Sequence, residues 1–257
     1  MPRKIPSAEQ THRIRSASAH SLVTTSMAEP DAEIKDTVSG FLASHGRTVK
    51  EIPRAANQTP DLLVDENSPD ATLVEIKVKT DDPSEMANLS QQLQTGEVVG
   101  RSKPTDGWNR LDALVSDAQS QMKAIDPQRT IPRLVWFHCV GLDSSVGEMR
   151  LVATIYGTPK LISMQISGVV TACCFWNSSF FRHRSELDGV VISRGEKAQL
   201  HLNEFSPRFA AFAHSHLVQV FWDRRLASGK VHRPSGDELR LSRYPQCAGA
   251  HAWVLAS

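Results

Sequence analysis

Two carboxylates and a lysine stand close together in the first third of the chain, and their types suit phosphate chemistry. Asp61 follows Pro60, and after a gap of thirteen residues Glu75 and Lys77 flank Ile76. Hydrolysis of a phosphodiester at neutral pH requires a divalent cation, bound by hard oxygen ligands, to offset the charge of the transition state. A cationic group nearby positions the attacking water or lowers its pKa. The three charged side chains are therefore candidates for a metal-dependent hydrolytic site.

The segments that carry these residues are predicted to form two adjacent strands. Residues 61–65 (DLLVD) and residues 72–78 (TLVEIKV) are mostly apolar, and the cluster between them is typical of a turn. A turn centred on Ser68 and Pro69 would pair residue i with residue 137 − i, which places Asp61 opposite residues 75–77 to within one residue.

The two-residue period of a strand decides which of these side chains share a face. Glu75 and Lys77 are two residues apart, so they project from the same face. A bulge or splay near the end of the first strand would bring Asp61 to that face as well. Ile76 points the other way, into the core, and its main-chain carbonyl is then a candidate for a further metal ligand.

Amphipathic helices are predicted on both sides of this strand pair. Residues 31–46 carry apolar side chains at helical spacing, and residues 111–125 do the same before Pro127. Residues 47–52 are predicted to be extended, and residues 133–140 to form a buried strand. Residues 80–109 are polar and interrupted by proline and glycine, which indicates a long loop with one short helix.

The motif in this setting resembles the PD-(D/E)xK nuclease superfamily, which has Pro-Asp, a variable gap and then Glu-x-Lys. The resemblance covers about residues 31–140. It implies a restriction-endonuclease-like core (helix, three-strand meander, helix, strand), with Asp61, Glu75 and Lys77 as the catalytic set. It further implies Mg²⁺ or Mn²⁺ as cofactor and nucleic acid as substrate, DNA rather than RNA. The alternative is a non-catalytic nucleic-acid-binding or scaffold protein that keeps this fold.

The resemblance also suggests ligands beyond the motif. Members often place an acidic residue of the first helix at the metal, and Glu33 is the candidate, with Asp36 as the alternative. Some relatives carry a glutamine on the helix after the motif, where Gln119 and Gln121 stand in this chain. The metal ligands expected are thus Asp61, Glu75, the carbonyl of Ile76, and Glu33.

We predict an α/β fold in three parts. Residues 1–29 are polar and lack periodicity, so we expect a disordered arm. Residues 30–147 would form the nuclease-like core, and residues 148–257 a strand-rich region merged with it. The strands expected in this last part are residues 150–157, 160–166, 169–176, 189–193 and 198–204.

Composition places the chain among ordinary globular proteins, with 40% hydrophobic and 22% charged residues and a formal net charge of +1. The four cysteines show no metal-ligand spacing, which favours a reducing cytoplasm. Residues 161–181 carry no charge over a length that could cross a bilayer, but their polar residues and Gly168 favour two strands, so we expect no membrane partner. A homodimer is left open.

Other candidate groups are weaker. His214 and His216 have the types of a metal pair without a carboxylate partner in view, so surface or core positions are the preferred interpretation. Trp108 would stack on a base or anchor its loop. Basic residues that could contact phosphate gather late in the chain and in the arm: Arg224, Arg225, Lys230, His232, Arg233, Arg240 and Arg243, with Arg3, Lys4, Arg13 and Arg15.

Overall fold

The structure is a computed structural model. It describes residues 30–53, 59–96, 98–100, 102–104, 109–163, 170–176, 178–222, 229–232 and 251–254. The arm predicted over residues 1–29, Trp108 and most of the late basic residues lie outside this part of the chain.

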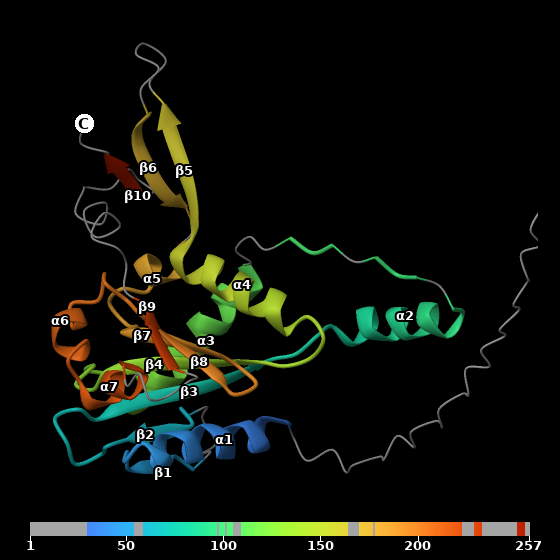
Figure 1. The fold of residues 1–257 in the computed structure, drawn as a ribbon. Helices are drawn as coiled ribbons and strands as arrows, with labels where there is room; N and C mark the ends of the chain where they lie inside the picture. The colour runs from blue at the N-terminus through green and yellow to red at the C-terminus, as the bar shows by residue number, and fades with distance from the viewer. Residues whose placement is uncertain are drawn as a thin grey trace, which may run out of the picture.

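A mixed sheet of seven strands forms the middle of the molecule (Figure 1), in the order β1-β2-β3-β4-β7-β8-β9. The first three strands are antiparallel neighbours, whereas β4 runs parallel to both β3 and β7. Beyond β7, β8 is antiparallel and β9 is parallel to β8. The bounds are β1 (Val49–Glu51), β2 (Leu62–Val64), β3 (Thr72–Lys79), β4 (Arg133–Cys139), β7 (Gly189–Arg194), β8 (Lys197–Leu202) and β9 (Gly229–His232).

Helices cover both faces of this sheet, which makes the fold a mixed α/β sandwich with two cores. On one face lie α1 (Pro30–Ser44), α6 (Phe209–Phe212) and α7 (His216–Trp222), and their apolar side chains pack against the sheet. The opposite face carries α3 (Asn109–Ile125), α4 (Ser144–Tyr156) and α5 (Ser179–Arg182). Figure 1 shows α1 on one side of the sheet and α3 and α4 on the other.

Alternation along β3 divides its side chains between the two cores. Val74 and Ile76 pack in the core under α1, and Leu73 packs in the core under α3. Because side chains alternate in a strand, Glu75 and Lys77 share the face of Leu73 and point toward α3.

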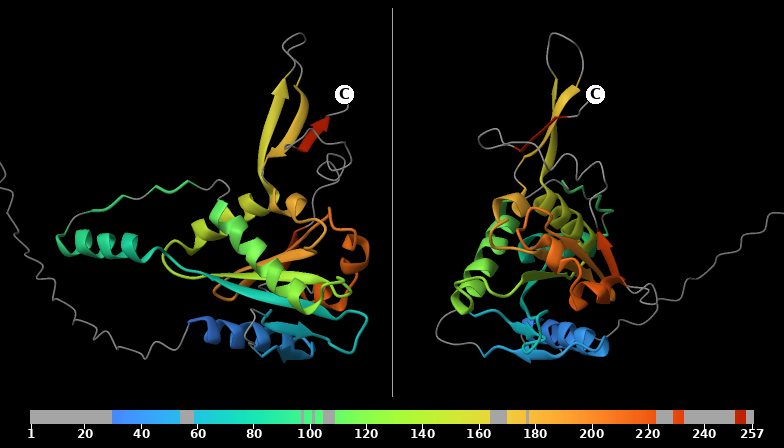
Figure 2. Two further views of the ribbon diagram at one scale, coloured as in Figure 1. Left: turned by 180° about the vertical axis from the view of Figure 1, so that it is seen from behind. Right: turned by 90° about the vertical axis from the view of Figure 1, so that its left-hand side faces the viewer.

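Two parts of the chain extend away from the sandwich. The helix α2 (Pro83–Gln94) buries none of its residues and begins at Asp82, whose carboxylate accepts the N–H of Ser84. A second sheet, ordered β10-β6-β5, contains β5 (Thr158–Ser163), β6 (Val170–Trp176) and β10 (His251–Val254). Both features project from the body in Figure 2.

The strand predicted over residues 150–157 is wrong, because this segment lies within the helix α4. Its β-branched and aromatic residues suggested a strand, but Gly147, Leu151, Thr154 and Ile155 are buried at helical spacing. A parallel neighbour of β4 also needs a long crossover, and α4 is part of the chain that leads from β4 to β7.

The uncharged stretch at residues 161–181 contributes to β5 and β6, which pair antiparallel as expected. Within the described residues, no helix combines the length and the apolar content that a membrane span requires.

Candidate metal centre

The register of the β2–β3 pair decides whether the two motif carboxylates meet. Leu62 pairs with Val74, and Leu63 pairs with Leu73, so each pair sums to 136 rather than the 137 expected from the turn. Continued by one residue, this register sets Asp61 directly opposite Glu75, on the face toward α3. The one-residue difference makes the bulge expected at Asp61 unnecessary, because cross-strand partners share a face.

Asp61 is buried directly before the start of β2 and has a polar contact on each oxygen. Its Oδ2 accepts the main-chain N–H of Ile76 at 3.0 Å. Its Oδ1 lies 3.2 Å from the ammonium of Lys35, which reaches it from α1. The first contact fixes the carboxylate against β3, and the second compensates its charge.

Pro60 precedes Asp61 and cannot take part in the β2–β3 ladder as a hydrogen-bond donor. In the observed register, Pro60 would face Ile76, but proline has no N–H to donate to the Ile76 carbonyl. Since the N–H and C=O of one strand residue point to the same side, this carbonyl points toward Asp61, as the Ile76 N–H does. The side chain of Ile76 packs in the opposite core. The Ile76 carbonyl is therefore a candidate ligand for a cation beside Asp61.

Glu75 is the most deeply buried charged group of the site, with 3% of its surface exposed. One of its oxygens, Oε1, lies 2.9 Å from the Nζ of Lys77, while Oε2 is buried without a hydrogen-bond partner. Burial and the negative charge of Asp61 raise the pKa of Glu75 from 4.5 to about 7, against the opposing effect of Lys77. A buried carboxylate with one unpaired oxygen is costly unless a cation joins it.

Lys77 connects this carboxylate to α3. Its Nζ also lies 2.8 Å from Oδ2 of Asp117, which accepts a second hydrogen bond from Gln121 at 3.1 Å. Burial alone would lower the pKa of Lys77, but its hydrogen bonds to Asp117 and Glu75 raise it above the ordinary value. Lys77 is therefore held as an ammonium next to Glu75.

Not every residue expected at the site lies there. Glu33 and Asp36 are exposed on α1, and the α1 side chain that contacts Asp61 is Lys35. Glu33 and Lys35 are two residues apart, so they project from nearly opposite sides of the helix. The helix thus brings a cation to Asp61, where a carboxylate was expected.

Of the two glutamines of α3 that were expected near the site, one contacts it and the other does not. Gln121 joins the chain of contacts through Asp117. Gln119 is buried, and its side-chain nitrogen has no hydrogen-bond partner.

Two residues of the site, Lys35 and Asp117, were missed in the sequence. Asp117 stands four residues before Gln121, so the two share a helix face, and that spacing was the available signal. Lys35 follows Ile34 at the margin of the apolar face of α1, but nothing in the sequence distinguishes it from a solvated lysine.

The donors present fit a hard divalent cation of the Mg²⁺ type. Mg²⁺ is usually held by one or two carboxylates together with water and substrate phosphate, rather than by a closed protein cage. Asp61, Glu75 and the Ile76 carbonyl meet that requirement, and the unpaired Oε2 of Glu75 is the atom that a cation would satisfy. The described residues contain no cluster of three or more His, Cys, Asp or Glu side chains around one point.

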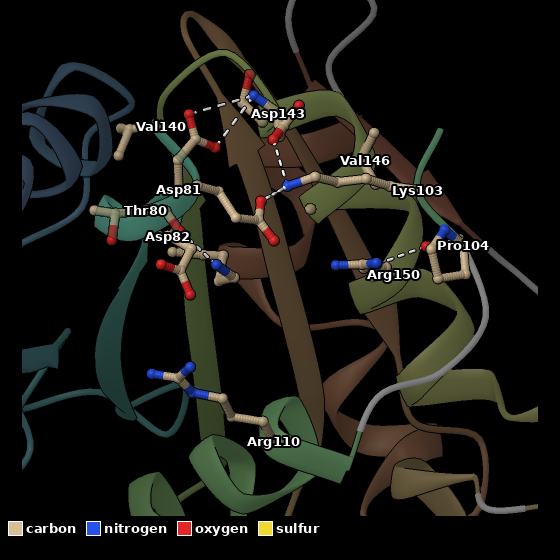
Figure 3. A pocket seen from close by; sticks show the side chains of 14 residues that line it. Thr80, Asp81, Asp82, Lys103, Pro104, Arg110, Val140, Asp143, Val146 and Arg150 are labelled. Carbon is tan, nitrogen blue, oxygen red and sulfur yellow. Dashed lines mark hydrogen bonds and ion pairs between the residues drawn. The ribbon is translucent and has the colours of Figure 1, made fainter. Parts of the chain in front are cut away.

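A cavity of ≈ 380 Å³ lies at the C-terminal ends of β3 and β4 (Figure 3). Lys79, two residues beyond Lys77 on the same strand face, is part of its lining. Oppositely charged side chains interact across it: Lys103 contacts Asp143 at 2.6 Å and also contacts Glu85. None of the motif residues Asp61, Glu75 and Lys77 lines this cavity.

The histidine pair lies at the surface, as preferred from the sequence. His214 is exposed, and Nδ1 of His216 lies 2.8 Å from Oδ2 of Asp70. These contacts belong to the start of α7 and not to the strands that carry the motif.

Comparison of the chain with protein-family models, with curated proteins and with solved structures finds no match in any of the three. The case for a function therefore depends on the geometry of Asp61, Glu75 and Lys77.

Proposed function

We propose that this chain is a Mg²⁺- or Mn²⁺-dependent nuclease of the PD-(D/E)xK type that hydrolyses phosphodiester bonds of nucleic acid. The observation that supports it most is the register that sets Asp61 opposite Glu75. Oε2 of Glu75 has no hydrogen-bond partner, while Lys35 contacts Asp61 and Lys77 contacts Oε1 of Glu75. DNA is preferred over RNA on the family resemblance alone.

Each motif residue has a separate task in this proposal. Asp61, Glu75 and the Ile76 carbonyl would hold the divalent cation, which when bound polarises the phosphate and lowers the pKa of a bound water. Lys77, held as an ammonium by Asp117 and Glu75, orients the attacking water and stabilises the charge that develops on the phosphate oxygens.

The protonation of Glu75 couples binding of the cation to pH. With a pKa of about 7, Glu75 is partly protonated at neutral pH in the absence of a cation. A divalent ion binds only the ionised carboxylate, so its binding displaces a proton. We therefore expect the affinity for Mg²⁺ or Mn²⁺ to rise with pH between about 6 and 8.

The proposal is tested by incubating the purified chain with DNA and Mg²⁺ or Mn²⁺, with EDTA as the metal-free control. Asp61→Asn should weaken metal binding and cleavage together, because it removes a ligand charge while keeping the shape. Lys77→Ala should leave metal binding largely intact and slow cleavage by roughly 10² to 10⁴, the usual range for loss of a group that acts on the proton and charge.

His214→Ala is the matched control, because His214 is exposed and distant in sequence from the motif, and it should cleave like the unmodified chain. Cleavage unaffected by both Asp61→Asn and Lys77→Ala would refute the proposal. Salt-sensitive binding of DNA without cleavage under any metal would favour the non-catalytic alternative.

A further inference from the structure

The helix α1 brings a positive charge to the candidate metal centre. The Nζ of Lys35 lies 3.2 Å from Oδ1 of Asp61 and 3.9 Å from Oε2 of Glu51. Its side chain is 16% exposed, although lysine normally extends into water. The ammonium is thus positioned between two carboxylates rather than solvated.

Lys35 reaches Asp61 from the opposite side of the sheet to Lys77. The helix α1 packs on one core, and Glu75 and Lys77 face the other, where α3 lies. Asp61 stands directly before the start of β2, where Lys35 from the α1 layer and Glu75 from the α3 face both interact with its carboxylate. Each motif carboxylate therefore has one lysine: Lys35 on Oδ1 of Asp61, and Lys77 on Oε1 of Glu75.

The two sides of Asp61 differ in charge: the ammonium of Lys35 contacts it on the α1 side, and the carboxylate of Glu75 lies on the β3 side. The unpaired Oε2 of Glu75 and the Ile76 carbonyl both lie on the β3 side of Asp61. On the α1 side, a second divalent ion would have to share Asp61 with the ammonium of Lys35. The repulsion between two such charges a few ångströms apart is large unless water separates them.

We propose that the site binds a single divalent cation, and that Lys35 takes the place that a second cation occupies in two-metal nucleases. This inference rests on the proposed metal site. In this arrangement Lys35 supplies positive charge on the α1 side of Asp61, and it competes with the divalent ion for that carboxylate. The identity of residue 35 then sets how many ions the site takes and how tightly.

The test is a titration of the full chain with Mn²⁺ alone, without nucleic acid, followed by calorimetry and by the electron paramagnetic resonance of free Mn²⁺. The unmodified chain should bind one ion. Lys35→Gln should also bind one ion, roughly tenfold more tightly, because one competing charge is gone. Lys35→Glu should bind two, since it places a third carboxylate beside Asp61 and Glu51.

Lys50→Gln is the matched control. Lys50 lies on β1, next to Glu51 in the chain, and its exposed ammonium pairs with Glu66 at 2.6 Å. The substitution removes the same charge near the same sheet edge, so its Mn²⁺ affinity should stay within about twofold of the unmodified chain. A tenfold change in the Mn²⁺ affinity of Lys50→Gln would show that any nearby lysine affects the site through long-range electrostatics. That result would overturn the inference.

The remaining outcomes separate this inference from the proposed function. Two ions on the unmodified chain, together with cleavage of DNA, would overturn the single-ion inference and leave the nuclease standing. If the unmodified chain binds one ion and the Lys35 variants respond as expected, but DNA is not cleaved, the single-ion inference is supported and the proposed nuclease activity is refuted. Absence of any Mn²⁺ binding would overturn both. If Lys35→Glu does not fold by circular dichroism, the affinity of Lys35→Gln decides, and an unchanged affinity rejects the inference.

Discussion

The carboxyl groups of Asp61 and Glu75 lie opposite each other one residue beyond the Leu62–Val74 pair of the β2–β3 ladder. The charge on Asp61 adds to burial in raising the pKa of Glu75. Two acidic groups so close destabilise the folded chain in the absence of a cation, which is the arrangement expected where binding rather than stability is served.

The first prediction concerns stability against pH. Burial and Asp61 raise the pKa of Glu75 in the folded chain to about 7, from 4.5. Its contribution to stability is therefore complete below pH 4.5 and is lost as the pH rises through 7. The loss is about 3 kcal/mol at most for a group this buried. Glu75→Gln should match the unmodified chain at pH 4 and exceed its free energy of unfolding by up to about 3 kcal/mol at pH 8.

Urea unfolding of both proteins across this pH range is the measurement. Other acidic groups, such as Asp126, have lowered pKa values and act in the opposite direction, so the difference between the two proteins is the relevant quantity. A difference that does not change with pH would show that Glu75 keeps an ordinary pKa.

The second prediction concerns Asp117, the α3 residue that contacts Lys77. Asp117 raises the pKa of Lys77, so Asp117→Asn should lower it. If cleavage requires the ammonium form of Lys77, the alkaline limb of the pH–rate profile should move to lower pH in this variant. Its affinity for Mn²⁺ should change little. A pH–rate profile measures this, with Asp36→Asn, an exposed aspartate of α1, as the control. An unshifted alkaline limb would separate Asp117 from the chemistry.

The third prediction concerns Asp188, which is fully buried between β4 and β8. It accepts the main-chain N–H of Arg133 at 2.9 Å and a hydrogen bond from Arg129 at 2.8 Å. Asp188→Ala removes the acceptor of the buried Arg133 N–H and the charged partner of Arg129, so it should lower the free energy of unfolding by about 3 to 5 kcal/mol.

The half-exposed pair of Arg194 and Glu148, 2.9 Å apart, offers the comparison for Asp188. Glu148→Ala removes a charge pair of similar length from the surface and should cost under about 1 kcal/mol. Chemical denaturation at one pH compares the two variants, and similar losses would show that burial does not decide the outcome.

The fourth prediction concerns Gly141, which follows β4 with φ +97. A Cβ at this position would collide with the carboxylate of Asp81, which accepts the N–H of Leu142 at 2.7 Å and so is not free to move. Gly141→Ala should therefore destabilise the chain by roughly 3 kcal/mol, from strain and collision together.

Gly46 separates these two causes. It has φ +75 after α1, but nothing lies within 4 Å of an added Cβ. Gly46→Ala should cost about 1 kcal/mol, which is the strain of positive φ alone. Melting temperatures measured in parallel give the difference, and equal losses would mean that Asp81 moves aside without cost.

The strands of the motif and the helices α1 and α3 were predictable because each follows a period that its own sequence displays. The geometry of the site could not be predicted with the same certainty, because the β2–β3 register depends on how the turn at Ser68 and Pro69 closes. A register shift of one residue changes the face of the sheet on which Asp61 lies. Lys35 could not be found, since its partner Asp61 is distant in sequence and the contact depends on how α1 packs on the sheet. The helix over residues 150–157 was missed because β-branched residues occur in both helices and strands. Which of its side chains are buried depends on packing against β4 and β7, which lie elsewhere in the sequence.

The central position of β4 has a consequence for how the chain is divided. All the motif residues lie before residue 147, but one edge of β4 pairs with β7, more than 50 residues later. A fragment that stops at residue 147 would expose that edge as a template for other chains, and it would leave much of the core under α1 uncovered. We expect such a fragment to aggregate, so the motif strands depend on the later strands for a stable fold, and the site would form only after those strands have been synthesised.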